Sequence, residues 1–367
     1  MSIDNFKMSS DKNLKAMVAM SGGVDSSVAA YLTKSMGYET IGVTMKLFDN
    51  EDVGEPRDNM CCTLDDVEDA RSVANRLGIK HYVFNFQDDF RGEVIDRFIQ
   101  AYEEGRTPNP CIDCNRYIKF KRLFRRGVEL QQDYVVTGHY ARVIRDASGR
   151  FLLAKSKDAH KDQSYVLYTM TQEQLAHAFF PLGEMTKEET REIAEEQGFV
   201  NAKKRDSQDI CFVPDRDYAA FIKQYTGKTY PPGDFVDWKG DVLGEHKGLI
   251  HYTIGQRKGL GLALPEPLYV LKKEVVNNRV LLGPNDALFT ESMLVEDVNW
   301  IAFDELESDL NLSVKIRYSQ EVSEATVIPI SKDRVLVEFN EGQRAITPGQ
   351  AAVFYDGDIV VGGGTIA

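Results

Sequence analysis

Apolar and polar positions in the first half of the chain repeat the order of a strand followed by a helix. Short apolar runs at 15–20, 39–48, 81–86 and 133–141 have the length of buried strands. Between them, segments 26–37, 64–78 and 116–130 show helical spacing, and 64–78 carries one apolar face formed by Leu64, Val67, Ala70, Val73, Ala74 and Leu77. This alternation predicts a parallel sheet with helices on both faces. Ligands of such sheets bind beyond the carboxyl ends of the strands.

The pattern changes in the second half of the chain. Helical spacing continues at 186–198 and 216–227, and then loops rich in glycine and proline separate short strands. A hairpin is predicted around Asn277 and Asn278. Alternation at 310–318, 324–330, 334–340 and 351–367 predicts a small antiparallel barrel. We therefore expect an α/β domain at 1–215, a small β-rich central domain at 216–286 and a C-terminal antiparallel β-barrel at 287–367.

The overall charge is acidic, which changes what can be expected of nucleic-acid binding. Taken alone, a net charge of −13 argues against a nucleic-acid partner, because contacts to phosphate dominate that affinity. However, the stretch KFKRLFRRG at 119–127 concentrates basic side chains, namely Lys119, Lys121, Arg122, Arg125 and Arg126. A local patch of this kind can bind RNA on an acidic protein, although a solvated helix face explains the charges equally well.

Cysteine usage and hydropathy favour a cytoplasmic protein. The chain has five cysteines, an odd number that suits a reducing compartment better than a disulfide framework. No apolar run approaches the ~20 residues of a membrane helix, and the first residues lack the apolar core of a signal peptide. We expect a soluble cytoplasmic monomer with no membrane partner.

The junction between the first strand and the first helix reads VAMSGGVDSS (18–27) and predicts an anion site. Successive backbone N–H groups in a glycine turn, followed by a helix N-terminus, form a nest that binds phosphate. Ser21, Ser26 and Ser27 would add hydroxyl donors. The lysine of the G-x-x-x-x-G-K-[ST] phosphate loop is missing here, so a different class of nucleotide site is indicated.

SGGVDSS is similar to the pyrophosphate-binding loop of the ATP pyrophosphatases, enzymes that split ATP between its α and β phosphates and adenylate a carbonyl oxygen. Further stretches resemble the tRNA-specific 2-thiouridylases in that family's order: TPNPCIDCN, GHYA, KDQSY, DSQDICF, HYTIGQRKGLG and PGQAAVFY. The resemblance covers essentially the full chain. It implies 2-thiolation of the wobble uridine of tRNA, with ATP and Mg²⁺ as cofactors. The anticodon stem-loop of tRNA and a sulfur-donor protein would be the partners.

The resemblance also implies roles for individual residues. The ATP site would comprise Ala19, Met20, Ser21, Gly22, Gly23, Val24, Asp25, Ser26, Met45 and Gly138. Asn109, Pro110 and Cys111 match positions at the target base. Positions that contact tRNA are matched by His139, Lys161, Asp162, Gln163, Arg317, Tyr318 and Gln350.

Two cysteines are matched to sulfur chemistry by the same resemblance. Cys211 would carry a persulfide, and Cys114 would resolve it as a disulfide; both would be catalytic. Cys114 lies where the basic helix is predicted to begin, and a helix N-terminus near Arg116 and Lys119 should lower the pKa of its thiol. We expect no catalytic role for the adjacent pair Cys61 and Cys62.

Cys111 departs from the family pattern and leaves alternatives open. Many relatives have aspartate at this position, whereas here Cys111 and Cys114 form a C-x-x-C motif. With Cys211, these residues could instead hold a [4Fe–4S] cluster with one open iron position, or a structural zinc. Two other functions also remain open: a different adenylating synthetase of the superfamily, and an RNA-binding protein that retains an inactive nucleotide fold.

Overall fold

The structure is a computed structural model that describes residues 14–48, 64–204, 209–213, 217–263 and 265–367. Its contacts divide the chain into two compact units. Unit 1 comprises residues 1–94, 111–214 and 358–360, and unit 2 comprises residues 95–110, 215–357 and 361–367. None of the described helices is long and apolar enough to span a membrane.

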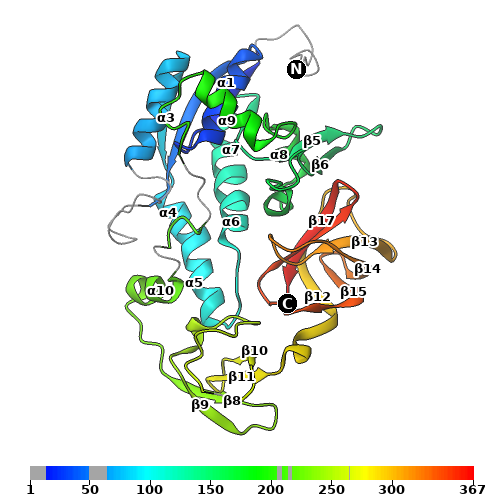
Figure 1. The fold of residues 1–367 in the computed structure, drawn as a ribbon. Helices are drawn as coiled ribbons and strands as arrows, with labels where there is room; N and C mark the ends of the chain where they lie inside the picture. The colour runs from blue at the N-terminus through cyan, green and yellow to red at the C-terminus, as the bar shows by residue number, and fades with distance from the viewer. Residues whose placement is uncertain (1–13, 49–63, 205–208, 214–216, 264) are drawn as a thin grey trace. The chain divides into compact units, whose positions relative to one another are not determined.

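Unit 1 is built on a five-stranded sheet in the order β3-β2-β1-β4-β7, and most of this unit is coloured from blue to green in Figure 1. Its strands are β1 (Lys15–Ala19), β2 (Glu39–Lys46), β3 (Lys80–Asn85), β4 (Tyr134–Val136) and β7 (Ala178–Phe179), and every pair is parallel. The predicted parallel sheet is therefore confirmed. The central strand β1 is almost entirely buried, as expected for a strand covered on both faces, whereas the edge strand β3 is largely exposed.

Helices α1 (Val24–Ser35), α3 (Leu64–Leu77) and α9 (Lys187–Glu196) share one apolar core with strands β1 and β4. Val18, Val28, Ala70 and Val136 are each fully buried in it. Helix α9 begins with a capping box in which the Thr186 hydroxyl accepts a hydrogen bond from the Glu189 amide. This core fixes the position of the start of α1 relative to the end of β1.

The basic helix begins earlier than the sequence predicts. It runs without interruption through α6 (Pro110–Asp113), a π-helical stretch η3 (Cys114–Leu123) and α7 (Phe124–Glu129). The expected start near Cys114 is wrong because Pro110 occupies the first helical position, where a missing N–H costs nothing and the fixed φ suits the helix. Cys111 therefore lies in the first turn, and Cys114 follows after that turn.

Smaller elements complete unit 1. Strands β5 (Arg142–Arg145) and β6 (Phe151–Ala154) form an antiparallel hairpin, and Leu153 and Ala154 also pair with Val360 and Ile359. The remaining helical segments are α4 (Gln87–Phe90), η2 (Arg91–Ile95, which continues into unit 2), η4 (Ser164–Leu167) and α8 (Gln172–Ala176).

Unit 2 contains the two other predicted β structures. A four-stranded sheet has the order β10-β11-β8-β9, with β8 (Gly233–Val236), β9 (Val242–His246), β10 (Tyr269–Glu274) and β11 (Arg279–Gly283). The β10–β11 pair is the predicted hairpin, and Asn278 has a φ of 49° in its turn. Helical segments of this unit are α5 (Asp96–Glu103), α10 (Tyr218–Thr226), η6 (Leu249–His251) and η7 (Asn285–Leu288).

The C-terminal barrel is antiparallel and closed. Its strand order is β12-β15-β14-β13-β16-β17, and an additional β12–β17 pairing closes it. The strands are β12 (Phe289–Trp300), β13 (Leu310–Lys315), β14 (Ser323–Ser331), β15 (Arg334–Arg344), β16 (Ala351–Asp356) and β17 (Ile359–Ile366). Val295, Val327, Val337 and Phe354 fill its interior. Closure leaves no free sheet edge, which confirms the predicted barrel.

Candidate functional site

The predicted phosphate loop joins β1 to α1 at the carboxyl edge of the sheet. Gly22 has a φ of 74°, and a Cβ on it would lie 2.7 Å from the Asp66 Cα. Only glycine meets both demands. The N-cap residue Gly23 is extended, and the following helix presents its first N–H groups without intrahelical acceptors. Such a helix start attracts anions.

The loop serines hold the turn itself. The Ser26 and Ser27 hydroxyls donate to the Gly23 carbonyl oxygen at 3.0 and 2.9 Å. The Ser21 amide donates to Ser26 Oγ at 3.1 Å. In the structure these serines fix the shape of the nest, and their role as phosphate donors stays a prediction.

Asn201 supports the loop from a distant part of the chain. It is 3% exposed, and its Nδ2 donates to the Gly22 carbonyl at 2.8 Å and to Ser27 Oγ at 2.9 Å. Its Oδ1 is buried and has no hydrogen-bond partner among the described residues. Nothing in the local sequence around Asn201 indicates this role.

Asp25 is the carboxylate of the loop, and it is already paired. The Lys187 ammonium lies 2.7 Å from Asp25 Oδ1, and the Tyr140 hydroxyl donates to the same oxygen at 3.0 Å. Lys187 is the first residue of α9, and only 7% of its side chain is exposed. The pair places a buried positive charge next to the phosphate loop. The sequence analysis missed both Lys187 and Tyr140.

The segment that follows β4 packs directly on the loop. A Cβ on Gly138 would lie 2.8 Å from the Asp25 carbonyl carbon and from the Ser26 nitrogen, so only glycine fits. Among the other predicted ATP-site residues, Ala19, Met20 and Val24 are buried around the loop, and Met45 of β2 is half-buried. The structure therefore places Gly138 against the loop, and its expected contact with ATP stays a prediction.

His139 is buried rather than displayed on a surface. It is 6% exposed and packs against the rings of Phe120 and Phe180, which also contact each other. Burial, with a smaller contribution from the nearby Lys119 ammonium, lowers the pKa of His139 well below its usual value. The neutral imidazole contacts Thr137 Oγ1 at 2.6 Å through Nδ1 and Lys119 Nζ at 3.3 Å through Nε2. Its predicted contact with tRNA stays a prediction.

Three of the cysteines can be described. Cys111 is exposed, Cys114 and Cys211 are half-buried, and all three are thiols rather than disulfides. Cys211 precedes Phe212, whose ring meets Phe90 edge-on at 5.7 Å. Cys61 and Cys62 lie outside the described residues. Across the described part of the chain, no three His, Cys, Asp or Glu side chains come together in a group that could hold a metal ion. The cluster and zinc alternatives therefore stay predictions that no preformed ligand group among the described residues supports.

The predicted tRNA residues at 161–163 mostly stabilise their own loop. Gln163 exchanges hydrogen bonds with the main chain of Tyr140, through its side-chain Oε1 at 3.0 Å and its own amide at 2.8 Å. Asp162 accepts from the Ser164 hydroxyl at 2.7 Å and from the Ser156 amide at 3.0 Å. The Lys161 amide donates to the Asp158 carbonyl.

Unit 2 contains three of the residues predicted to contact tRNA. Tyr318 is exposed, whereas the side chains of Arg317 and Gln350 form hydrogen bonds within the protein. Tyr318 is 42% exposed, and the Lys315 ammonium lies 5.8 Å from its ring centre. Arg317 donates to the Ala345 carbonyl at 2.6 Å and to Thr347 Oγ1 at 2.9 Å. Gln350 donates to the Thr107 carbonyl at 2.8 Å. Asn109 and Pro110, predicted at the target base, follow Thr107 along the chain.

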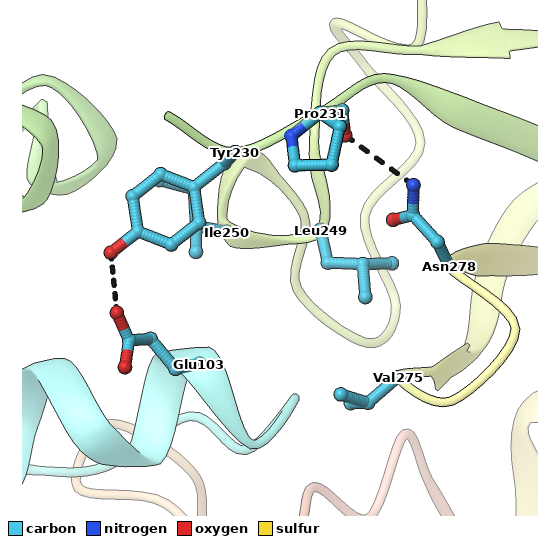
Figure 2. A pocket seen from close by; sticks show the side chains of 7 residues that line it. All are labelled: Glu103, Tyr230, Pro231, Leu249, Ile250, Val275 and Asn278. Atoms are coloured by element: carbon cyan, nitrogen blue, oxygen red, sulfur yellow. Dashed lines mark hydrogen bonds between the residues drawn. The ribbon is translucent and has the colours of Figure 1, made fainter. Parts of the chain in front are cut away.

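Unit 2 also contains a cavity of about 300 Å³, shown in Figure 2. The Tyr230 hydroxyl donates to Glu103 Oε1 across it at 2.6 Å. Burial and this hydrogen bond raise the pKa of Tyr230 to about 12, so the phenol remains a donor. The lining residues are Glu103, Tyr230, Pro231, Leu249, Ile250, Val275 and Asn278. None of the predicted ATP, target-base or tRNA residues is among them.

Comparison with family models divides the chain into three consecutive matches. Residues 14–215 match the model described as a tRNA methyl transferase HUP domain, and residues 219–284 match a tRNA methyl transferase PRC-barrel domain. Residues 290–366 match an aminomethyltransferase beta-barrel domain.

Whole-chain relatives are similar over nearly their full length. A tRNA-specific 2-thiouridylase MnmA of Lachnoclostridium phytofermentans is 52% identical, over 96% of this chain and 99% of that protein. Proteins of the same name from Clostridioides difficile and Clostridium perfringens are 52% and 50% identical, each over 96% of this chain and 98% of theirs. With the glycine loop and the cysteine-bearing helix in one unit, this similarity shows that the chain belongs to the tRNA-specific 2-thiouridylase family.

Proposed function

We propose that this protein catalyses ATP-dependent 2-thiolation of the wobble uridine in tRNA. The observation that carries the proposal is that unit 1 contains both the glycine loop and all three described cysteines. The names of the relatives support tRNA as the substrate and thiolation as the reaction. An adenylating synthetase that uses ammonia would have no use for the cysteines.

The first step is adenylation of the base. The uracil C2 oxygen attacks the α-phosphorus of ATP, and pyrophosphate leaves. The N–H groups at the start of α1 bind the phosphates, and Asn201 keeps the loop in the shape that directs those groups outward. The Lys187 ammonium compensates negative charge beside the loop.

Mg²⁺ fits this site as an ion that enters with the nucleotide. It is usually held by one or two carboxylates together with substrate phosphates, rather than by a cage of protein ligands. Asp25 is the carboxylate of the loop and would contribute an oxygen. When bound, Mg²⁺ would neutralise charge on the departing pyrophosphate.

The second step replaces oxygen by sulfur. The terminal sulfur of a Cys211 persulfide attacks C2 of the adenylated base, and AMP leaves with the former C2 oxygen. The Cys114 thiolate then attacks the Cys211 sulfur, which releases 2-thiouridine and leaves a Cys114–Cys211 disulfide. A sulfur-donor protein supplies the persulfide sulfur, and a thiol reductant must restore the two thiols.

The base must leave its stack for this chemistry. Uridine at the tip of the anticodon loop is unpaired, which lowers the energy needed to turn it outward. Asn109, Pro110 and Cys111 are proposed at the target base. His139, Lys161, Asp162, Gln163, Arg317, Tyr318 and Gln350 are proposed at the tRNA. Tyr318 with Lys315 is the clearest of these contacts, because an exposed ring beside a cation suits base stacking.

The proposal is tested with purified protein, unmodified tRNA, ATP and a persulfide donor. Digested tRNA should contain 2-thiouridine by mass spectrometry, and the nucleotide products should be AMP and pyrophosphate. A methylated uridine or ADP would contradict the proposal.

Three variants separate the roles of the cysteines. Cys114→Ser and Cys211→Ser should each abolish thiolation, whereas Cys111→Asp should keep it and serves as the matched control. Labelled sulfur should be found on Cys211 after incubation with the donor. A thiolating enzyme with no persulfide on Cys211, and with a visible iron chromophore that Cys111→Ser bleaches, would instead establish the cluster route.

A further inference from the structure

The turn that precedes β16 holds the chain segment leading to the cysteine helix. We define the barrel turn as residues 347–350 and the leading segment as residues 106–110, both in unit 2. Gln350 Nε2 donates to the Thr107 carbonyl at 2.8 Å and lies 3.5 Å from the Pro108 carbonyl oxygen. In return, the Thr107 amide donates to the Pro348 carbonyl at 2.9 Å. Each stretch therefore donates a hydrogen bond to the other.

Close packing reinforces this contact. Gly349 has a φ of 88°, and a Cβ on it would lie 3.0 Å from the Arg106 Cβ and 3.1 Å from the Thr107 nitrogen. The two backbones approach so closely because this residue has no side chain. The Thr107 hydroxyl is buried there and has no hydrogen-bond partner among the described residues. Its desolvation costs free energy, so the main-chain hydrogen bonds of Thr107 must hold it in place.

The barrel turn is itself rigid. Arg317 holds its first residue, because its guanidinium donates to Thr347 Oγ1 and to the carbonyl of Ala345. Strand β17 holds its other end: the Ile366 amide donates to the Gln350 carbonyl at 2.8 Å, and the Gly349 amide donates to the Ile366 carbonyl at 2.8 Å. Gln350 therefore belongs to a turn whose two ends are held by hydrogen bonds to the closed barrel.

The leading segment is stiff and ends at reactive residues. Pro108 and Pro110 restrict their own φ angles and those of the residues before them. Pro110 is also the first residue of α6, in which Cys111 follows directly. A displacement at Thr107 is therefore transmitted along only a few restricted bonds to the residues proposed at the target base.

We infer that Gln350 is a positioning residue: by fixing Thr107 and Pro108, it sets where Asn109 and Pro110, the residues of unit 2 proposed at the target base, lie during the proposed thiolation. Its Nε2 is engaged in this contact, so Gln350 acts on the reaction by way of the leading segment, whether or not its Oε1 also meets tRNA. The catalytic consequence rests on the proposed function, but the contact itself does not. Misplacement by ~1 Å near reacting atoms can cost about 100-fold in rate.

The test compares two substitutions with a matched control. Gln350→Glu keeps the size but removes the donor and turns a carboxylate toward two carbonyl oxygens, whereas Gln350→Lys keeps a donor. Gln320→Glu is the control, because Gln320 lies in the barrel and donates to Gln343 rather than to the leading segment. Hydrogen exchange at the Thr107 amide is measured on the protein alone. Single-turnover thiolation and tRNA affinity are measured separately.

Gln350→Glu should speed exchange at Thr107 about tenfold and slow thiolation by at least the same factor, with tRNA affinity changed less than about twofold. Gln350→Lys should restore slow exchange and most of the rate, and Gln320→Glu should change neither. Unchanged exchange in Gln350→Glu would overturn the inference. So would a loss of tRNA affinity that alone accounts for the lost rate. If the unaltered enzyme forms no 2-thiouridine, the proposed function fails, and the exchange measurement still decides the contact.

Discussion

Replacing Lys187 by methionine tests the buried ion pair beside the phosphate loop. Methionine keeps the apolar length of the side chain but removes the ammonium that lies 2.7 Å from Asp25 Oδ1. Removing one partner of a fully buried pair costs about 3–5 kcal/mol because a charge is left uncompensated. Here the Asp25 side chain is 32% exposed and keeps the hydrogen bond from Tyr140, so water and the phenol compensate part of the loss. We expect a cost of about 2 kcal/mol.

The positions of the tryptophans allow the two units to be followed separately. The chain has two tryptophans, Trp238 and Trp300, and both belong to unit 2. Far-ultraviolet circular dichroism is dominated by the helices, most of which belong to unit 1. With a urea dependence of about 2 kcal/mol per molar, Lys187→Met should lower the dichroism midpoint by about 1 M and leave the tryptophan fluorescence midpoint unchanged.

A double-mutant cycle with Asp25→Asn isolates the pair from other effects of the substitution. Once Asp25 is neutral, Lys187→Met should cost at least about 1 kcal/mol less than it does alone. An unchanged dichroism midpoint in Lys187→Met would refute the reasoning, and so would strictly additive effects of the two substitutions.

Three further predictions concern other parts of the molecule. Gly138→Ala should abolish ATP-dependent AMP release because its Cβ would meet the Asp25–Ser26 backbone at 2.8 Å; Gly92→Ala, whose Cβ would have no neighbour within 4 Å, should not. Asn201→Ala should raise the KM for ATP about tenfold, since the loop loses two hydrogen bonds. Burial lowers the pKa of Lys273 to about 8, below its value in the unfolded chain, so the unfolded state binds more protons above that pH. Stability measured by tryptophan fluorescence should therefore rise by about 1.5 kcal/mol between pH 8 and pH 9.5, and Lys273→Met should remove the rise.

The parts of the fold that the sequence predicts are those set by local chemistry. The sheet, the hairpin at Asn278 and the barrel follow from periodicity and turn residues, and each is confirmed. Gly22 is recognisable for the same reason, since a positive φ and a close neighbour both require glycine. The basic helix is predicted to begin near Cys114 but begins at Pro110, because a proline can occupy the first position of a helix as well as end a loop.

The supporting residues of the site could not be found in this way, because their partners are distant in sequence. Asn201 contacts Gly22 across 179 positions, and Lys187 contacts Asp25 across 162. Each stands in an ordinary local context, in which a loop asparagine or a lysine in a first helical turn predicts nothing specific. Only the packing of α9 and the following turn against α1 brings them to the loop.

His139 and Gln350 show a second limit of prediction from sequence. The sequence indicates that these residues belong to the functional region, but not whether they contact tRNA or position other residues of the protein. The resemblance implies tRNA contact for both residues, which stays a prediction, and the structure shows that each also has partners within the protein. A buried neutral imidazole accepts a hydrogen bond from the Lys119 ammonium and so orients a cation on the helix that carries Cys114. Gln350 likewise commits its donor to the segment that leads to Cys111. Substituting such a residue would impair a tRNA-modifying enzyme in the same way as a lost RNA contact. Activity alone therefore cannot distinguish the two roles, and the deciding measurements are those made on the protein without tRNA.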